Sequence, residues 1–235
     1  MRANSSGSLA GVMVEAYQGA AGFIFAPEGW FPRLEHWIRS RGLLFALDEV
    51  QAGFGRTGKL FAMEWENLQP DLVSLGKGMG SGMPASAIAA RSDVVGVLSG
   101  GEMSSTMGGN PVACAAVVAV VEIFEREKLE QNALRIGALM KNRLEQIKEK
   151  CPYVGDVRGR GLVMGVELVK DKQTTEPAPD LTKKLIDVAA QNGLLIGSVG
   201  IFGNVIRVAP PLVISEDEAV ESLDLFEKSL GMLQA

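Results

Sequence analysis

The sequence predicts an α/β fold in which a large domain with a mainly parallel sheet is followed by a small C-terminal α+β domain. Two observations support this prediction. In the first half of the chain, short runs that are apolar on both faces alternate with helical patterns, as in parallel sheets covered by helices. After Pro152 the strand candidates become shorter and the helices amphipathic. We therefore expect residues 1–125 to form part of the large domain and residues 126–235 to form the small one.

The first half of the chain shows strand, helix and strand patterns in succession. Three apolar runs end on polar residues, and a further short run resembles them; we expect strands within 9–16, 43–50, 71–78 and 86–91. Between the first two runs, "PEGWFPRLEHWIRSRG" predicts a helix, because its apolar residues recur at helical spacing and Gly42 provides a stop.

The second half begins with two helices. The segment 110–127 opens with Asn-Pro, a favourable cap followed by proline at the first helical position, and its alanines and valines predict packing on most sides. Residues 128–152 predict a long amphipathic helix. Beyond it we expect short strands within 161–169, 194–199 and 204–209, and helices within 180–192 and 215–233.

Composition excludes several classes of protein. The 235 residues are 47% apolar with a formal net charge of −5, and no basic face is available for nucleic acid. The longest apolar run, Val112–Val121, is too short to span a membrane and predicts a buried helix instead. Residues 1–9 lack the apolar core of a secretion signal, so we expect a cytoplasmic protein.

Histidine and cysteine are scarce. His36 is the only histidine, and Cys114 and Cys151 are the only cysteines. This count argues against a metal site, a disulfide framework and His-dependent nucleophilic catalysis.

Three polar features end predicted parallel strands, where ligands bind in open α/β sheets: Glu15, the stretch 48–51 and Lys77. Lys77 lies in "SLGKGMGSGMP", which lacks the spacing of a phosphate-binding loop. It could be an ordinary surface lysine. Its apolar flanks instead favour partial desolvation, a lowered pKa and a nucleophilic amine suited to Schiff-base chemistry.

Asp48 ends a fully apolar strand, where a carboxylate is costly to bury without a cation. It could simply cap the turn that follows. Together with a Schiff-base lysine, however, a buried carboxylate can keep a pyridine nitrogen protonated, so that the ring acts as an electron sink.

The stretch "LDEVQAGFGRTGKLFAMEWENLQPDLVSLGKGMGSGMP" closely resembles the hallmark segment of class III pyridoxal-phosphate-dependent aminotransferases, and in particular of 4-aminobutyrate and other ω-amino-acid aminotransferases. "TMGGNPVACAAVVAVVE" and "VIRVAPPLVI" resemble further segments of that family, in the same order. The resemblance covers nearly the whole chain. It implies fold type I, in which residues 1–125 are a partial cofactor-binding large domain.

The resemblance also implies roles toward pyridoxal 5′-phosphate. Lys77 would form the Schiff base and carry the proton, and Asp48 would pair with the pyridinium nitrogen. Val50 would pack on the ring and Gln51 would contact its phenolic oxygen. Thr106 would hydrogen-bond the phosphate across the interface of a homodimer with shared active sites.

Two further residues would bind substrate. Arg207 would hold a substrate carboxylate, and Glu15 would pair with Arg207 until an α-carboxylate displaces it. The alternative for these two residues is a purely structural ion pair. Arg56, in "GFGRTG", is expected to shape its loop or a dimer contact rather than take part in the chemistry.

The implied activity is ping-pong transfer of an amino group from an ω-amino acid or amine to 2-oxoglutarate or pyruvate. A class III aminomutase or racemase is the alternative reaction. The chain departs from the family in having Ala16 after Glu15 where proline is usual, and in lacking a long N-terminal portion. We therefore expect exposed apolar faces, and the third possibility is a truncated, catalytically incomplete fragment.

Overall fold

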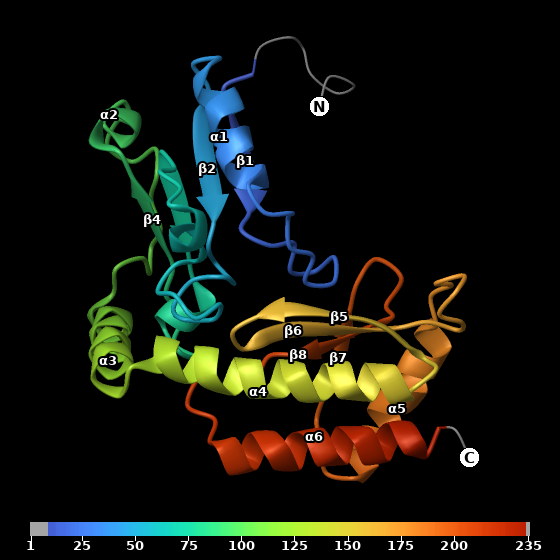
Figure 1. The fold of residues 1–235 in the computed structure, drawn as a ribbon. Helices are drawn as coiled ribbons and strands as arrows, with labels where there is room; N and C mark the ends of the chain where they lie inside the picture. The colour runs from blue at the N-terminus through green and yellow to red at the C-terminus, as the bar shows by residue number, and fades with distance from the viewer. Residues whose placement is uncertain (1–8, 234–235) are drawn as a thin grey trace. The chain divides into compact units, whose positions relative to one another are not determined.

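The structure, a computed structural model, describes residues 9–233, which divide into two compact units (Figure 1). The first unit comprises residues 9–16, Ala26–Gly55 and Lys59–Lys128, and the second comprises Tyr17–Phe25, Arg56–Gly58 and residues 129–233. The division after Lys128 lies close to the predicted boundary at 125, but the two short segments were not predicted to join the second unit. The expectation about a secretion signal concerns residues 1–8, which lie outside the described residues.

The first unit is built on a four-stranded sheet in the order β1-β2-β3-β4. The first three strands run parallel, and the fourth is antiparallel to β3. The strands are β1 (Gly11–Glu15), β2 (Leu44–Asp48), β3 (Leu72–Leu75) and β4 (Ala87–Ala90). The prediction of an α/β unit with a mainly parallel sheet is therefore confirmed.

One face of this sheet is covered by α1 (Trp30–Arg39), as Figure 1 shows. The apolar core on this face consists of Val12, Phe31, Ile38, Phe45, Leu47 and Leu68. On the other face Met13 is 61% exposed and Ile88 is 52% exposed. The expectation of strands buried on both faces is wrong for the described residues, since no described helix covers this second face.

The helix α3 (Pro111–Glu127) begins as predicted. The Asn110 side chain accepts a hydrogen bond of 2.9 Å from the Ala113 backbone N–H, and Pro111 occupies the first turn. The expected burial of this helix is wrong among the described residues, because Val112 is 67% exposed and Val118 is 57% exposed. The exposed valines do agree with the expectation of uncovered apolar faces.

Three short helices in the first unit were not predicted. They are η1 (Ala62–Glu66), η2 (Lys77–Met79) and α2 (Ser92–Val95). Each has five residues or fewer, which is too short for a helical period to show in a sequence.

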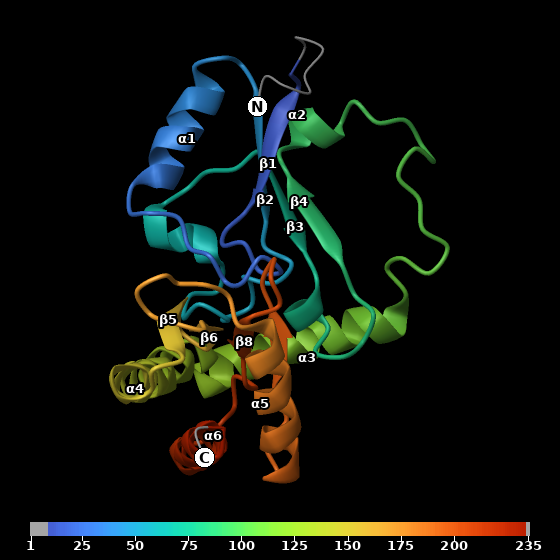
Figure 2. The same ribbon diagram turned by 90° about the vertical axis from the view of Figure 1, so that its right-hand side faces the viewer.

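The second unit contains an antiparallel sheet in the order β5-β6-β8-β7 (Figure 2). Its strands are β5 (Val154–Arg160), β6 (Val163–Leu168), β7 (Gly197–Val199) and β8 (Val205–Val208). Three of them lie within predicted ranges. β5 was missed, because "VGDVRGR" contains two glycines and three charged residues.

Three helices complete the second unit: α4 (Leu129–Lys150), α5 (Pro179–Gln191) and α6 (Glu216–Gly231). All three were predicted. Their apolar stripes bury a common core with the sheet that includes Ile136, Met140, Leu185, Ile206 and Phe226. The small α+β domain expected in this half of the chain is therefore present.

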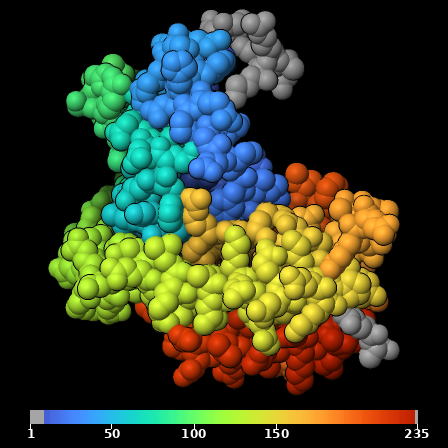
Figure 3. Space-filling view, viewed as in Figure 1, coloured from blue at the N-terminus to red at the C-terminus, as the bar shows by residue number. Residues whose placement is uncertain are grey.

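The charges of α4 form ion pairs with α6, and the two helices lie side by side on the face shown in Figure 3. Arg135 lies 2.5 Å from Glu216, and Arg143 lies 3.1 Å from Asp224 and 2.6 Å from Glu227. These basic residues therefore belong to a solvated helix face, where each of them is paired with an acid of α6. Within residues 9–233, no helix has the length and apolar character needed to cross a membrane.

Candidate active site

Asp48 is the last residue of β2, at the carboxyl end of the parallel part of the sheet. It lies in register with Glu15 of β1 and Ser74 of β3. Its half-buried carboxylate accepts a hydrogen bond of 2.9 Å from the Val50 backbone N–H. The side chain is thereby held by its own turn, in the manner of an Asx turn.

Lys77 begins η2, two residues after the end of β3. Its backbone has φ 44°, which lies in the left-handed region that non-glycine residues rarely adopt. Strain of this kind clusters at functional sites. The expected desolvation of Lys77 is wrong for the described residues, because the side chain is exposed.

The glycines around Lys77 allow close approach of the backbone. A Cβ atom at Gly76 would lie 3.3 Å from Val50 Cγ1, and one at Gly78 would lie 3.2 Å from Phe54 Cβ. At Gly80 a Cβ would lie only 2.2 Å from the Met83 carbonyl oxygen. The loop of Lys77 therefore packs on the turn that follows Asp48 and lies against Val50 at one edge of the sheet.

Glu49, which follows Asp48, is a buried acid whose environment the sequence analysis did not predict. Its side chain is fully buried and accepts hydrogen bonds from the backbone N–H groups of Ala62 (3.0 Å) and Met63 (2.7 Å). The pKa of Glu49 is raised from its ordinary 4.5 to about 7, chiefly by burial and to a smaller extent by the charges of Glu64 and Asp48, although the two hydrogen bonds act to lower it. The sequence did contain a signal for this environment. An acid next to Asp48 at the end of an apolar run is costly to bury unless its oxygens accept hydrogen bonds.

The remaining predicted cofactor residues are not all brought to this edge. Gln51 is half-buried in the turn after Asp48. Thr106 is exposed in the connection between α2 and α3 and makes no hydrogen bond with a described residue. Its predicted contact with a phosphate across a dimer interface stays a prediction.

Arg207 lies on β8 in the second unit and is exposed. Its cross-strand neighbours are Gly165 on β6 and Gly197 on β7. Residues opposite one another in an antiparallel sheet share a face, so no side chain flanks Arg207 on either neighbouring strand. Open space lies only on the side of Gly197, where a Cβ atom would meet nothing within 4 Å, because the Gly22 carbonyl and the Phe23 ring fill the space over Gly165. The predicted pairing with Glu15 joins residues of different units and stays a prediction.

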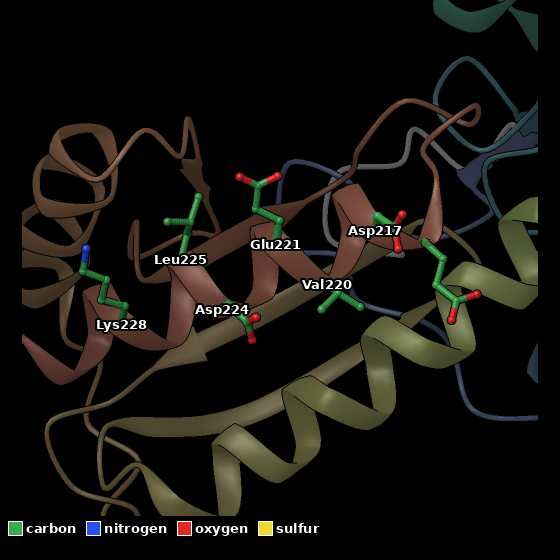
Figure 4. A pocket seen from close by; sticks show the side chains of 7 residues that line it. Asp217, Val220, Glu221, Asp224, Leu225 and Lys228 are labelled. Carbon is green, nitrogen blue, oxygen red and sulfur yellow. The ribbon is translucent and has the colours of Figure 1, made fainter.

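A depression of about 410 Å³ lies along α6 and is shown in Figure 4. Every residue that lines it comes from this one helix, and most are acidic: Glu216, Asp217, Val220, Glu221, Asp224, Leu225 and Lys228. Since Arg135 and Arg143 of α4 already pair with Glu216 and Asp224, this surface is a solvated helix face rather than a substrate site.

The edge formed by Asp48, Val50 and Lys77 suits a planar aromatic cofactor with a basic ring nitrogen and a carbonyl group. The carboxylate of Asp48 can hold a proton on such a nitrogen, and the lysine amine can react with a carbonyl. The isopropyl group of Val50, beside Gly76, offers an apolar surface to a ring. The donor set present in this unit therefore fits pyridoxal phosphate.

Comparison with known proteins gives a consistent result. The family model described as Aminotransferase class-III matches residues 1–230. An alanine/serine racemase of Pyrococcus horikoshii is 42% identical over 222 residues, which are 94% of this chain and 46% of that protein. A 4-aminobutyrate aminotransferase of Mycobacterium leprae is 42% identical over 223 residues, which are 95% of this chain and 50% of that protein.

Among solved structures, a transaminase from the marine bacterium Virgibacillus superposes with a TM-score of 0.90 at 30% sequence identity. The match covers 95% of this chain and 53% of that one. The chain thus spans about half the length of the curated relatives it matches. The resemblance inferred from the three motifs, and the fold that it implied, are confirmed.

Proposed function

Since the chain belongs to the class III aminotransferase family, whose members depend on pyridoxal phosphate, we propose that it carries part of a transaminase active site. The proposed reaction moves an amino group from an ω-amino acid or amine to 2-oxoglutarate or pyruvate. The observation that carries this proposal is the placement of Asp48 and Lys77 after neighbouring parallel strands, with the loop of Lys77 packed on Val50.

When bound, pyridoxal phosphate supplies an electron sink for the carbon that carries the amino group. The carboxylate of Asp48 would hold a proton on the ring nitrogen through the oxygen that does not accept the hydrogen bond from the Val50 N–H. Val50 and Gln51 would orient the ring. The amine of Lys77 would hold the cofactor and would carry the proton to and from the substrate carbon.

Arg207 binds the substrate carboxylate in this proposal. Its exposure, and the open space over Gly197 on the neighbouring strand, support access of a carboxylate to the planar guanidinium for a two-point contact. Glu15 is proposed to neutralise Arg207 when the amino donor has no α-carboxylate. Alternation between these two states would let one site serve donor and acceptor in turn.

A racemase is the second candidate, and a specific observation favours keeping it. The alanine/serine racemase and the 4-aminobutyrate aminotransferase are equally similar to this chain, each at 42% identity. Both reactions remove a proton from the carbon that bears the amino group. Only the transaminase consumes a 2-oxo acid as a second substrate, and the two reactions therefore give different products.

We also propose that the protein works as a homodimer in which Thr106 serves the partner's site. The support is the apolar surface of α3, where Val112 and Val118 stay largely exposed among the described residues. Sedimentation of the chain with and without pyridoxal phosphate tests this proposal, and a monomer under both conditions contradicts it.

The experiment that tests the function is site-specific labelling of Lys77. The protein is incubated with pyridoxal phosphate, reduced with borohydride and mapped by peptide mass spectrometry. We expect the pyridoxyl group on Lys77 and no such label in Lys77→Ala. Lys59 is the control, because its amine lies 5.5 Å from the centre of the Trp65 ring. Lys59→Ala should be labelled to the same extent as the unmodified chain. Random labelling, or none, contradicts the proposal and favours an incomplete fragment.

Turnover then separates the two reactions. We expect ω-amino acids to be consumed only when 2-oxoglutarate or pyruvate is present. Loss of optical activity from alanine or serine without a 2-oxo acid would instead establish the racemase.

A further inference from the structure

The buried carboxyl group of Glu49 fastens η1 to the turn that follows β2. It accepts hydrogen bonds from the backbone N–H groups of Ala62 at 3.0 Å and Met63 at 2.7 Å, the first two residues of η1. The N–H groups at the start of a helix have no partner within the helix, so an acceptor from another segment stabilises them. Since Glu49 lies between Asp48 and Val50 in the chain, this contact holds η1 against the segment that carries the proposed cofactor residues.

The backbone of Glu49 joins two further segments. Its N–H donates to the carbonyl oxygen of Ser74 at 3.0 Å, at the end of the strand that leads to Lys77. Its carbonyl oxygen accepts from the Gly53 N–H at 2.9 Å, and a Cβ atom at Gly53 would lie 2.9 Å from the same oxygen. Glu49 therefore contacts β3, its own turn and η1 through three separate groups.

Two phenylalanines connect η1 with the loop of Lys77. Phe61, which precedes η1, meets Phe54 edge to face, with ring centres 5.8 Å apart and ring planes at 77°. Phe54 is buried, and a Cβ atom at Gly78 would lie 3.2 Å from its Cβ, so the backbone of the lysine loop rests directly on this residue. A path of contacts thus leads from Glu49 through Phe61 and Phe54 to the residue that follows Lys77.

Phe54 and Lys77 both have left-handed backbones, with φ 54° and φ 44°. Non-glycine residues keep such conformations only where the surrounding structure over-determines them. The hydrogen bonds of Glu49 to η1, and the ring contact of Phe61 with Phe54, are constraints of this kind. Loss of these contacts is therefore expected to release the loop of Lys77 together with η1.

Glu49 is also the member of this path that can ionise. Its pKa is raised to about 7, chiefly by burial, and the charged groups that add to this shift are Glu64 of η1 and Asp48 of the turn, both of them acids. An opening that brings Glu49 into water returns its pKa to the ordinary 4.5. Opening is therefore resisted most at low pH, and becomes easier as the pH rises from 4.5 to 7.

From these contacts we propose that Glu49 is a positioning residue for Lys77. It keeps η1 docked on the turn after β2, and Phe61 and Phe54 pass this constraint to the lysine loop. The inference rests on the proposed role of Lys77 in holding the cofactor. The loop and η1 open together, and the amine is in place to meet a cofactor carbonyl only while Glu49 is docked.

Amide hydrogen exchange of the full chain, without cofactor, tests this coupling. Exchange rates are corrected for the intrinsic effect of pH, so that they report local opening. We expect opening of the peptides 59–66 and 74–83 to rise by up to about tenfold per pH unit from pH 5 to pH 7, and to stay level above pH 7. The peptide 111–127 of α3, which belongs to the same unit, should change by less than about twofold.

Glu49→Gln should abolish the rise in both peptides, because glutamine does not ionise. Glu64→Gln is the matched control. Glu64 also accepts a hydrogen bond at the start of η1, from the Phe61 N–H at 2.7 Å, but it is exposed and does not touch the turn after β2. The rise should persist in this variant.

Phe61→Ala tests the route by which the constraint travels. It removes the ring between η1 and Phe54 but keeps the two N–H groups that Glu49 binds. The pH-dependent rise should remain in the peptide 59–66 and disappear from the peptide 74–83. This variant keeps the proposal falsifiable if Glu49→Gln does not fold.

Cofactor binding is the second measurement. The dissociation constant of pyridoxal phosphate at pH 6 is expected to increase about tenfold in Glu49→Ala and to stay unchanged in Glu64→Gln.

A rise confined to the peptide 59–66 in the unmodified chain would overturn the inference, as would an equal rise in α3 or an unaltered rise in Glu49→Gln. A lysine loop that still follows pH in Phe61→Ala would overturn the route through the two rings. Since the exchange experiments use no cofactor, they remain decisive even if Lys77 is not labelled. Failure of the proposed function and failure of this inference are therefore distinguishable.

Discussion

The carboxylate of Asp48 and the backbone N–H of Val50 are joined by a hydrogen bond of 2.9 Å. The direction of the carboxylate is therefore set within a single turn and does not depend on a neighbouring element. The substitution Asp48→Asn separates the effect of the negative charge from the effect of the turn geometry. Asparagine keeps an oxygen that accepts the hydrogen bond and loses the charge.

We predict that Asp48→Asn lowers the rate of amino transfer by about a hundredfold or more, since it removes the charge that holds a proton on the ring nitrogen. The free energy of unfolding should change by no more than about 0.5 kcal/mol, because the turn is preserved. Rapid-mixing absorbance measures the first effect and urea unfolding the second. A variant with the original rate would show that the charge of Asp48 is not used.

Glu49 makes stability depend on pH. Its pKa is about 7 in the folded chain against an ordinary 4.5, so the folded state holds the proton more tightly than the unfolded state. The contribution of Glu49 to stability is therefore fully present below pH 4.5, falls as the pH rises toward 7, and is absent above it. The contribution lost over this interval is about 3 kcal/mol.

We predict that Glu49→Gln removes this contribution, because glutamine does not ionise and can still accept from the N–H groups of Ala62 and Met63. Urea unfolding at pH 5, 6, 7 and 8 should show the variant gaining stability relative to the unmodified chain as the pH rises. If the difference between the two proteins is the same at every pH, the buried carboxyl does not titrate in this range.

Asp71 anchors the opposite end of the first sheet. It is buried, its Oδ1 lies 2.6 Å from Arg91 and 3.6 Å from Arg39, and its Oδ2 accepts from the Phe45 N–H at 2.8 Å. We predict that Asp71→Ala costs about 2–4 kcal/mol of unfolding free energy, because it leaves a buried N–H without an acceptor beside two cations.

The matched control for Asp71 is Asp93→Ala. Asp93 also pairs with Arg91, at 2.5 Å, but it lies on the exposed surface. Thermal unfolding should show a much smaller loss for this variant. Equal losses in the two variants would mean that the ion pairs of Arg91, rather than the buried position of Asp71, stabilise the sheet.

Gly137 lies in the middle of α4, where alanine would ordinarily stabilise a helix by about 1 kcal/mol. A Cβ atom at this position would lie 2.2 Å from the Gly161 carbonyl oxygen. We predict that Gly137→Ala lowers the unfolding free energy by about 1–3 kcal/mol, because the turn between β5 and β6 must move away from the helix.

The control for Gly137 is Gly231, the last residue of α6, where a Cβ atom would meet nothing within 4 Å. Gly231→Ala should be neutral or slightly stabilising in the same urea titration. A stable Gly137→Ala variant would show that the turn after β5 tolerates displacement.

Most of the secondary structure could be predicted because the local signals are strong. Asn110 and Pro111 mark the start of α3, and long apolar stripes mark α4 and α6. The strand β5 could not be recognised, because its glycines and charges have no strand preference of their own. Its pairing with β6 across the turn at Gly161 determines its conformation.

For the candidate site, the sequence by itself determined which residues are candidates: a lysine in a glycine-rich loop, an aspartate at the end of an apolar strand and an arginine within a short strand. Only the tertiary structure decided how they are held. The approach of the Lys77 loop to Val50, the burial of Glu49 beneath η1 and the two carbonyls that hold Arg56 arise from contacts between separate segments of the chain. Such contacts have no local signature, because the free energy that maintains them comes from packing of the whole unit rather than from neighbouring residues.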